Sequence, residues 1–368
     1  MVEKVKRKRN YGIDLLRIIA IGMILILHIL GKDNVLASAE VFSANYKAAW
    51  LMEIGCYGAV NCYALVSGFV GIHGKPKASN IVMLWLQVFF YSVGGTVLFM
   101  ILEPAMVSKV ALFKSFFPVL TRQYWYFTAY FGLFLIIPLL NEAVRAISRK
   151  QLRNILILGL SFYSFIGIPF FNDPFQFNNG YSMFWLAILY VLGAYFGKYN
   201  TLASVSKFKM LCVYAGCVLI TWGGKMLFVR YDQQLPFFVF NKNFLVSYMS
   251  PTVLVAAIAL LGVFVYLEIG EKAGKIISYI GSLAFGVYII HEQPFISKYF
   301  IKGRFAYLSE GSALEMMVTV IFAMILIFTV CAFLDAARQW MFKMLRVKEA
   351  VVFMESKVLK YLKEKDVI

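Results

Sequence analysis

The sequence predicts an all-α protein, a polytopic membrane helix bundle with about ten transmembrane helices and both termini in the cytoplasm. The 368 residues are 61% hydrophobic and only 15% charged, whereas soluble domains are roughly 45–50% apolar and about 25% charged. The apolar residues also form runs long enough to cross a hydrocarbon core of about 30 Å as helices. In lipid, only helices and closed barrels satisfy every backbone hydrogen bond, and these runs are too long for barrel strands.

The apolar runs divide the chain into ten predicted spans and a polar tail. The spans are residues 12–31, 47–71, 80–102, 124–141, 153–170, 181–197, 208–230, 245–267, 276–293 and 314–337. No long polar linker separates them, so we expect one transmembrane domain over residues 1–337. Residues 338–368 alternate apolar side chains with Lys and Arg at helical spacing. They are predicted to form a basic amphipathic cytoplasmic tail on the anionic leaflet, with a solvated tail as the alternative.

The distribution of charge predicts how the bundle is oriented. Thirty-six Lys and Arg against nineteen Asp and Glu give a formal net charge of +17, which in a soluble protein would suggest nucleic acid as the partner. Here most basic residues fall in alternate loops, as the positive-inside rule describes. We therefore expect a multi-pass protein of the cell membrane whose partner is the lipid bilayer. We do not expect it to bind nucleic acid. The five cysteines have no metal or disulfide spacing, and no metal is expected.

Two ionisable residues, Arg17 and His28, lie eleven positions apart inside the first apolar segment. At about 100° per residue, eleven steps bring both side chains onto one face of a helix, and a rise of about 1.5 Å per residue separates them by roughly 16 Å. Asp14 lies on nearly the same face, one turn earlier. Ionisable groups inside a membrane are costly unless they face a partner or a wet cavity, so this face is predicted to be functional.

The positions of these two residues suggest separate roles. Arg17 lies in the predicted cytoplasmic half of its helix, where a guanidinium can hold a phosphate group. His28 lies near the outer end, where an imidazole can accept a proton from a hydroxyl near neutral pH. A substrate bound at Arg17 would need a long thin arm to reach His28. The structural alternative is an arginine that snorkels to the interface and a histidine that hydrogen-bonds a neighbouring helix.

The run N-Y-G-I-D-L-L-R-I-I-A-I-G-M-I-L-I-L-H, from Asn10 to His28, resembles the Arg-x10-His signature of the acyltransferase 3 family of membrane-bound acyltransferases. Three later stretches are similar to the family's pattern: A-L-V-S-G-F at 64–69, Y-W-Y-F to P-L-L-N over 124–141, and G-S-L-A-F-G-V-Y-I-I-H at 281–291. The resemblance implies ten helices and transfer of acyl groups to surface glycans. Many relatives carry paired arginines after the second helix, where this chain has only Lys75 and Lys77.

The resemblance implies an integral membrane O-acyltransferase. The acyl group, most often acetyl, would pass from cytoplasmic acetyl-coenzyme A to a hydroxyl of a cell-envelope polysaccharide or its lipid-linked precursor. Arg17 would engage the donor and His28 would act as general base, with succinyl and other short acyl groups left open. Four basic residues are expected to surround the cytoplasmic entrance for coenzyme A, each with topology-setting charge as the alternative. They are Lys75, Lys77, Arg145 and Lys150.

Secondary candidates follow from the predicted topology. Glu53 is expected at a depth from which its carboxylate can orient His28. His291 and Glu292, at the outer end of the ninth span, are candidates for binding the acceptor. Tyr124 and Trp125 begin the fourth span, where they either stack on a sugar or form the aromatic belt of the interface.

A transporter or flippase for glycans or lipid-linked sugars is the rival function. In such a protein Arg17 and His28 would bind substrate or relay protons. Transporters are commonly built from inverted repeats, and the two halves of this sequence show no convincing similarity to each other. The sequence therefore favours the enzyme.

Overall fold

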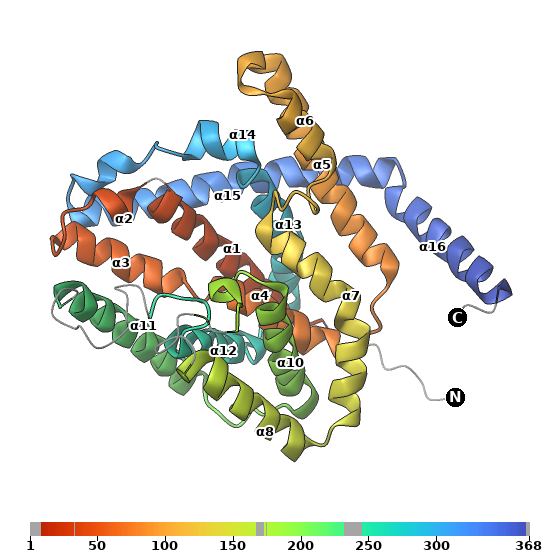
Figure 1. Ribbon diagram of the computed structural model, residues 1–368, viewed down its shortest axis with the longest axis horizontal. Coiled ribbons are helices and arrows are strands. Elements are labelled where there is room, and N and C mark those ends of the chain that lie inside the picture. Colours follow the sequence, from red (N-terminus) through yellow and green to blue (C-terminus); the bar gives the residue numbers. More distant parts are fainter. Residues whose placement is uncertain (1–8, 33, 167–172, 174, 232–244, 366–368) are drawn as a thin grey trace.

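The structure is a computed structural model that describes residues 9–32, 34–166, 173, 175–231 and 245–365 (Figure 1). All regular secondary structure in those residues is helical, which confirms the all-α class. Seven helical spans in the described part of the chain are long and apolar enough to cross a membrane, and α10 and α12 are shorter apolar helices. The protein is therefore a multi-pass membrane protein, and about ten is an approximate count of its spans.

Most of the bundle consists of long helices connected by short loops. The long helices are α1 (Tyr11–Lys32), α3 (Ala44–Cys56), α4 (Ala59–Gly71), α5 (Ala78–Leu102), α7 (Trp125–Ala146), α8 (Arg149–Leu160), α10 (Met183–Tyr199), α11 (Lys207–Arg230), α12 (Pro251–Val265), α13 (Glu271–His291) and α15 (Ala313–Met344). Short helices in the loops include α2 (Val35–Ser38), α6 (Lys109–Phe116), α14 (Pro294–Ile296), η4 (Ser297–Ile301) and η5 (Ala306–Ser309). The chain closes with α16 (Val347–Glu364).

The ends of the helices meet in two groups, as expected when a chain crosses a membrane back and forth. At the end predicted to be cytoplasmic, Arg145 at the end of α7 donates to the carbonyl of Ile72 after α4, at 3.0 Å. At the opposite end, Lys32 of α1 pairs with Glu292 after α13. Each contact joins helix ends that the predicted topology places on the same side, and the orientation in the membrane stays a prediction.

The predicted span 47–71 is a broken helix. Residues 57–58 separate α3 from α4, and the ring of Tyr57 packs against that of Tyr248 in the non-helical segment 245–250, with centroids 4.9 Å apart. Asn61 donates to the carbonyl of Tyr248 at 2.7 Å and accepts from the indole Nε1 of Trp185 at 3.1 Å. These bonds hold Tyr248 inside the bundle. The predicted span 245–267 is accordingly helical only from Pro251, a residue type favoured in the first turn of a helix.

Two predicted segments need comment. The predicted domain boundary at residue 337 lies within α15, which continues to Met344 and buries Arg338 against Asp335 at 3.0 Å. Arg346 then adopts a positive φ of 51°, which ends the helix before α16. The tail is helical, as expected, and its position on the leaflet stays a prediction. Of the span 153–170, α8 and the π-helical turn η2 (Ser161–Ile166) are described, and residues 167–170 lie outside the described residues.

The backbones of α4 and α10 approach so closely that their contact requires glycine. A Cβ atom on Gly193 of α10 would lie 2.1 Å from the carbonyl oxygen of Leu65, and one on Gly68 of α4 would lie 1.9 Å from that of Tyr190. Small residues permit such close helix contacts in membranes. This contact fixes α4, which lines the site described below.

We expect Gly193→Ala to lower the free energy of unfolding by about 1–3 kcal/mol, because the added methyl group meets backbone that cannot move aside. Thermal unfolding of the purified protein in detergent would show a lower midpoint. Gly216→Ala on α11 is the control, because that glycine faces open space. Equal midpoints for the two variants would contradict this account of the helix contact.

Candidate active site

The ring of His28, near the outer end of α1, meets the ring of His291 at the end of α13. Nδ1 of His28 lies 2.8 Å from Nε2 of His291 and 3.1 Å from Oε1 of Glu292. Lys32, one turn beyond His28, donates to the same carboxylate. The structure thus brings His291 and Glu292, predicted as acceptor-binding residues, into direct contact with His28.

Glu292 lies just beyond the last residue of α13 and is largely buried. The ammonium group of Lys32 pairs with its carboxylate, and Nδ1 of His28 lies 3.1 Å from the same oxygen, Oε1. Glu292 thus places a carboxylate, paired with Lys32, against Nδ1 of His28.

The hydrogen bonds of the two rings assign their protons. Nδ1 of His291 lies 2.7 Å from the carbonyl oxygen of Val287. A carbonyl can only accept, so this nitrogen carries a proton, and Nε2 of the neutral ring is an acceptor. Nδ1 of His28 then donates to it. In the neutral ring of His28 this leaves the lone pair on Nε2, an assignment that follows from the network of bonds.

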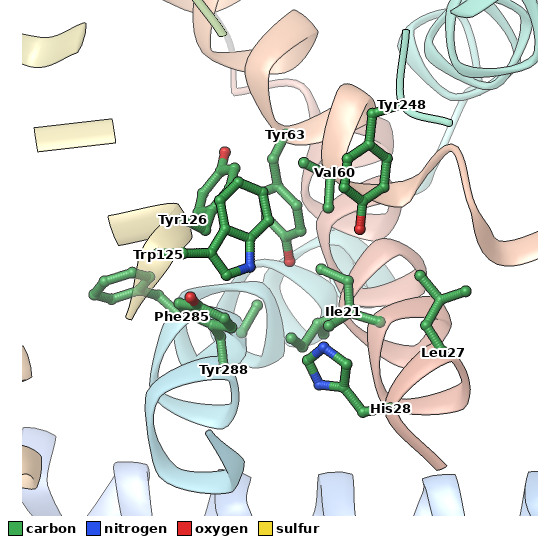
Figure 2. Close-up of a pocket in the computed structure, with 12 residues that line it drawn as sticks. Ile21, Leu27, His28, Val60, Tyr63, Trp125, Tyr126, Tyr248, Phe285 and Tyr288 are labelled. Atoms are coloured by element: carbon green, nitrogen blue, oxygen red, sulfur yellow. The ribbon is translucent and has the colours of Figure 1, made fainter. Parts of the chain in front are cut away.

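His28 faces an internal cavity of about 60 Å³ (Figure 2). Figure 2 shows a ring nitrogen of His28 and the indole nitrogen of Trp125 pointing into this space. Because Nδ1 is held by His291, the nitrogen that faces the cavity is Nε2. Such a volume holds about four water molecules, so a larger substrate enters only if side chains move. The lining is mostly aromatic and aliphatic: Ile21, Ile24, Leu27, His28, Val60, Tyr63, Trp125, Tyr126, Tyr248, Ala284, Phe285 and Tyr288.

Arg17 lies three turns before His28 on α1 and is held by an ion pair. Its NH1 group donates to Oδ1 of Asp14 at 2.9 Å. Asp14 is 2% exposed and also accepts from Nε of Arg9 at 2.6 Å. Two guanidinium groups therefore share one buried carboxylate, which leaves a net positive charge at this end of α1.

A column of tyrosines separates Arg17 from the cavity. The hydroxyl of Tyr63 donates to the backbone carbonyl of Arg17 at 2.8 Å. The rings of Tyr63 and Tyr126 have centroids 6.1 Å apart, and Tyr130 follows at 6.3 Å. The charge of Arg17 interacts with all three phenol groups. Tyr63 and Tyr126 also line the cavity, so they form the wall between Arg17 and His28.

Among the described residues, no contact joins Glu53 to His28. Its carboxyl group is buried on α3, and its Oε2 atom has no hydrogen-bond partner among the described residues. It interacts instead with Tyr57 and Tyr248, and the carboxylate against His28 is that of Glu292. A depth estimate from sequence could not find this, because depth does not determine which way a helix turns its side chains.

The four basic residues predicted at the cytoplasmic entrance have different surroundings. Arg145 donates to the carbonyls of Ile72 and Gly74 and so holds the loop that carries Lys75 and Lys77. Both lysines are exposed, and Lys150 is exposed on the first turn of α8.

The two neighbouring aromatic residues at the start of α7 have different surroundings. Trp125 lines the cavity with His28. Tyr124 is 1% exposed and packs its ring against that of Tyr288, with centroids 6.4 Å apart. Only Trp125 of this pair is in a position to meet a substrate in the cavity.

His28, His291 and Glu292 also meet the minimal geometry for a metal site, with ligand atoms within 4.8 Å of one another. Tetrahedral zinc at about 2.0–2.1 Å from each ligand needs donor atoms roughly 3.3 Å apart. The two ring nitrogens are closer than that, and Lys32 already donates to the carboxylate. The arrangement favours a hydrogen-bonded pair, and the expectation of no metal stays a prediction.

The fold and the site together define a multi-pass helical membrane protein with a histidine on an internal cavity. A family model described as an acyltransferase domain matches residues 10–336. The chain therefore belongs to the acyltransferase 3 family, and it is an acyltransferase with an acyl donor, an acceptor and a lipid bilayer as partners. No curated protein and no solved structure gives a match.

Proposed function

We propose that this enzyme is an O-acyltransferase of the cell membrane, with acetyl as the first candidate for the acyl group. It takes the acyl group from cytoplasmic acyl-coenzyme A and transfers it to a hydroxyl of a cell-envelope polysaccharide or its lipid-linked precursor. The observation that carries the proposal is the geometry of His28. Its Nδ1 is held by His291 and Glu292, and Nε2 faces the cavity with its lone pair available.

The proposed reaction is direct transfer with His28 as general base. Nε2 takes the proton of the acceptor hydroxyl as its oxygen attacks the thioester carbonyl carbon. The tetrahedral intermediate collapses, the carbon–sulfur bond breaks, and the imidazolium returns the proton to the leaving thiolate. The products are an ester and free coenzyme A, and the histidine is regenerated. Glu292 stabilises the imidazolium that exists between the two proton transfers.

Trp125 supports the same reaction as a hydrogen-bond donor. Its indole N–H points into the cavity that Nε2 of His28 faces. A preorganised donor in a largely apolar cavity stabilises the charge that develops on the carbonyl oxygen. The aromatic and aliphatic lining strengthens this interaction, because little water competes with it.

The donor is proposed to bind with its phosphates near Arg17 and its pantetheine arm along α1. The separation of roughly 16 Å suits a long, thin arm rather than a compact substrate. Arg9 and Arg17 together exceed the charge of Asp14, so this end of α1 attracts anions. Tyr63 and Tyr126 must move to admit the arm, because the cavity ends before Arg17.

We expect Arg17→Ala to raise KM for the acyl donor roughly 10- to 100-fold, the value of a charged hydrogen bond of about 1.5–3 kcal/mol, with little change in kcat. Arg17→Lys should give an intermediate KM, because it keeps the charge but loses the planar fork. Initial rates at varied donor concentration provide the measurement. A fall in kcat with unchanged KM would contradict the donor-binding role.

Mass spectrometry of surface glycans tests the function in cells. Wild type, His28→Ala and the control Cys212→Ala, an exposed residue of α11, are compared at matched membrane levels. We expect the acyl ester in wild type and control, no ester in His28→Ala, and the same amount of glycan at the surface in all three. If glycan were lost from the surface of the His28→Ala cells and the wild-type glycan carried no ester, the transporter would be supported instead. The family match gives that rival no support.

A further inference from the structure

A second cavity of about 960 Å³ opens between α5, α13 and α15. Its walls include Leu98 and Leu102 of α5 and Leu326 of α15, all of which are exposed on the surface of the bundle. On α15 the lining extends from residue 319 to residue 334, roughly 22 Å at 1.5 Å per residue. The cavity is therefore a long apolar groove on a membrane-spanning face, and we call it the α5–α15 groove.

The crossing of two helices creates this groove. The hydroxyl of Tyr91 on α5 donates to Oδ1 of Asp335 on α15 at 2.9 Å, and α5 crosses α15 in Figure 1. Beyond that contact, toward the predicted outer side, the floor is formed by the end of α13. A chain that lies in the groove contacts three helices at once.

One residue of the groove also belongs to the active site. His291 is among the residues that line the groove, and Nε2 of its ring lies 2.8 Å from Nδ1 of His28. The α5–α15 groove and the cavity at His28 thus lie on opposite sides of the end of α13. The distance across is about one helix diameter, roughly 10 Å.

Basic residues flank the outer end of the groove. The segment 294–309, which includes η4 and η5, contributes Tyr299, Phe300 and Tyr307 to the lining. It contains three basic residues and no acidic one, namely Lys298, Lys302 and Arg304, all exposed. Glu103 is the carboxylate in the described lining. Lys298 and Lys302 flank the lining residues 299–301 and are exposed, so they can pair with an anionic headgroup at the outer interface, whereas Glu103 would repel one.

We propose that the α5–α15 groove binds the single hydrocarbon chain of a phosphate-bearing lipid that carries the acceptor sugar. The phosphate lies against Lys298 and Lys302, and the sugar reaches over the end of α13 to His28. This inference rests on the proposed function, because it names the acceptor as a lipid-linked sugar delivered from within the bilayer.

Another groove of similar size provides an internal comparison. It lies between α7, α8 and α10, has a volume of about 890 Å³ and is lined by apolar and aromatic residues without a charged one. None of the active-site residues lines it. Ordinary bilayer lipid covers both grooves, and only the α5–α15 groove connects to the catalytic histidines and to basic residues.

Photolabelling tests the proposal independently of catalysis. The full-length protein in phosphatidylcholine vesicles is labelled with a diazirine-bearing polyprenyl phosphate, and labelled peptides are quantified. Leu326→Trp fills the α5–α15 groove, and Leu158→Trp fills the other. Both side chains are exposed, at 53% and 63%, so neither substitution disturbs the core. We expect labelling of α15 to fall about tenfold in Leu326→Trp and to be unchanged in Leu158→Trp.

Two further arms identify the headgroup and the source of the label. Lys298→Ala combined with Lys302→Ala should lower labelling several-fold, and excess inorganic phosphate should not displace the probe. A diazirine-bearing phosphatidylcholine should label both grooves alike. Equal labelling of both grooves by the polyprenyl phosphate, or no effect of Leu326→Trp, would overturn the proposal.

The variant His28→Ala separates this lipid site from the proposed function, and it should bind the probe normally. Retention of acyl transfer in that variant would refute the proposed function but not the lipid site.

Discussion

Replacing His28 by alanine is expected to lower the rate of acyl transfer by about 10²- to 10⁴-fold, the usual contribution of a positioned general base. Because Nδ1 of His28 is held by His291 and Glu292, the lone pair on Nε2 points into the cavity. Removing the imidazole therefore removes the proton acceptor. Release of coenzyme A thiol by the purified protein in lipid measures the rate.

The same variant should bind the donor normally, because Arg17 lies roughly 16 Å away along α1. Equilibrium binding of a non-hydrolysable acyl-coenzyme A analogue tests this, with Cys212→Ala as the matched control for purification. A His28→Ala enzyme that keeps more than a tenth of the wild-type rate would exclude His28 as general base.

Replacing Glu292 by glutamine is expected to lower kcat about 10- to 100-fold, the value of a charged hydrogen bond of about 1.5–3 kcal/mol, and to leave KM for the donor unchanged. The substitution keeps the shape of the side chain but removes the negative charge 3.1 Å from Nδ1 of His28. The imidazolium formed during the reaction is then less stable, although Nδ1 can still donate to His291. Steady-state rates at saturating acceptor give the two constants.

A double variant separates this role from a merely structural one. If Glu292 acts through His28, then Glu292→Gln should cost nothing further once His28 is alanine, because the two residues act as a unit. Glu53→Gln is the comparison, since Glu53 does not contact His28 among the described residues. A larger loss of kcat in Glu53→Gln than in Glu292→Gln would favour the carboxylate that the sequence suggested.

The relation between Arg17 and His28 could be predicted from the sequence because it depends on one helix. Both residues lie in α1, which is continuous from Tyr11 to Lys32, so helical periodicity alone fixes their common face. The ion pair of Arg17 with Asp14 follows from the same periodicity, since three residues separate them. Local geometry was sufficient for this half of the site.

The environment of Nδ1 of His28 could not be predicted in the same way. His291 is 263 positions away, and only the packing of α13 on α1 brings the two rings together. Lys32 was missed for the same reason, because its role depends on Glu292. One signal was present in the sequence: a second histidine and a carboxylate at the end of another span, at the same predicted depth.

Helix breaks were the main difference within the fold. Hydropathy gave the spans 47–71 and 245–267 as continuous, because residues 57–58 and 245–250 are not polar enough to interrupt an apolar window. In the structure the side chain of Asn61 bonds the carbonyl of Tyr248 and so holds the non-helical segment 245–250. A single buried asparagine in an apolar run carries little weight in a window average.

The helix at the predicted tail boundary extends further for a related reason. The sequence predicts a cytoplasmic tail from Arg338 onward. In the structure Asp335 accepts its hydrogen bonds one turn earlier, so the arginine stays buried and α15 continues to Met344. Charge alone does not mark the end of a span when an opposite charge lies at helical spacing.

The most direct test of the central claim is the position of the proton on the His28 ring. Nitrogen-15 NMR of the purified protein labelled at its three histidines, assigned by comparison with His28→Ala, reports which ring nitrogen carries hydrogen at neutral pH. We expect the neutral His28 ring to be protonated at Nδ1, with Nε2 as a bare lone pair toward the cavity. A proton on Nε2 and a bare Nδ1 would contradict the account, because the ring could not then accept the proton of an acceptor hydroxyl.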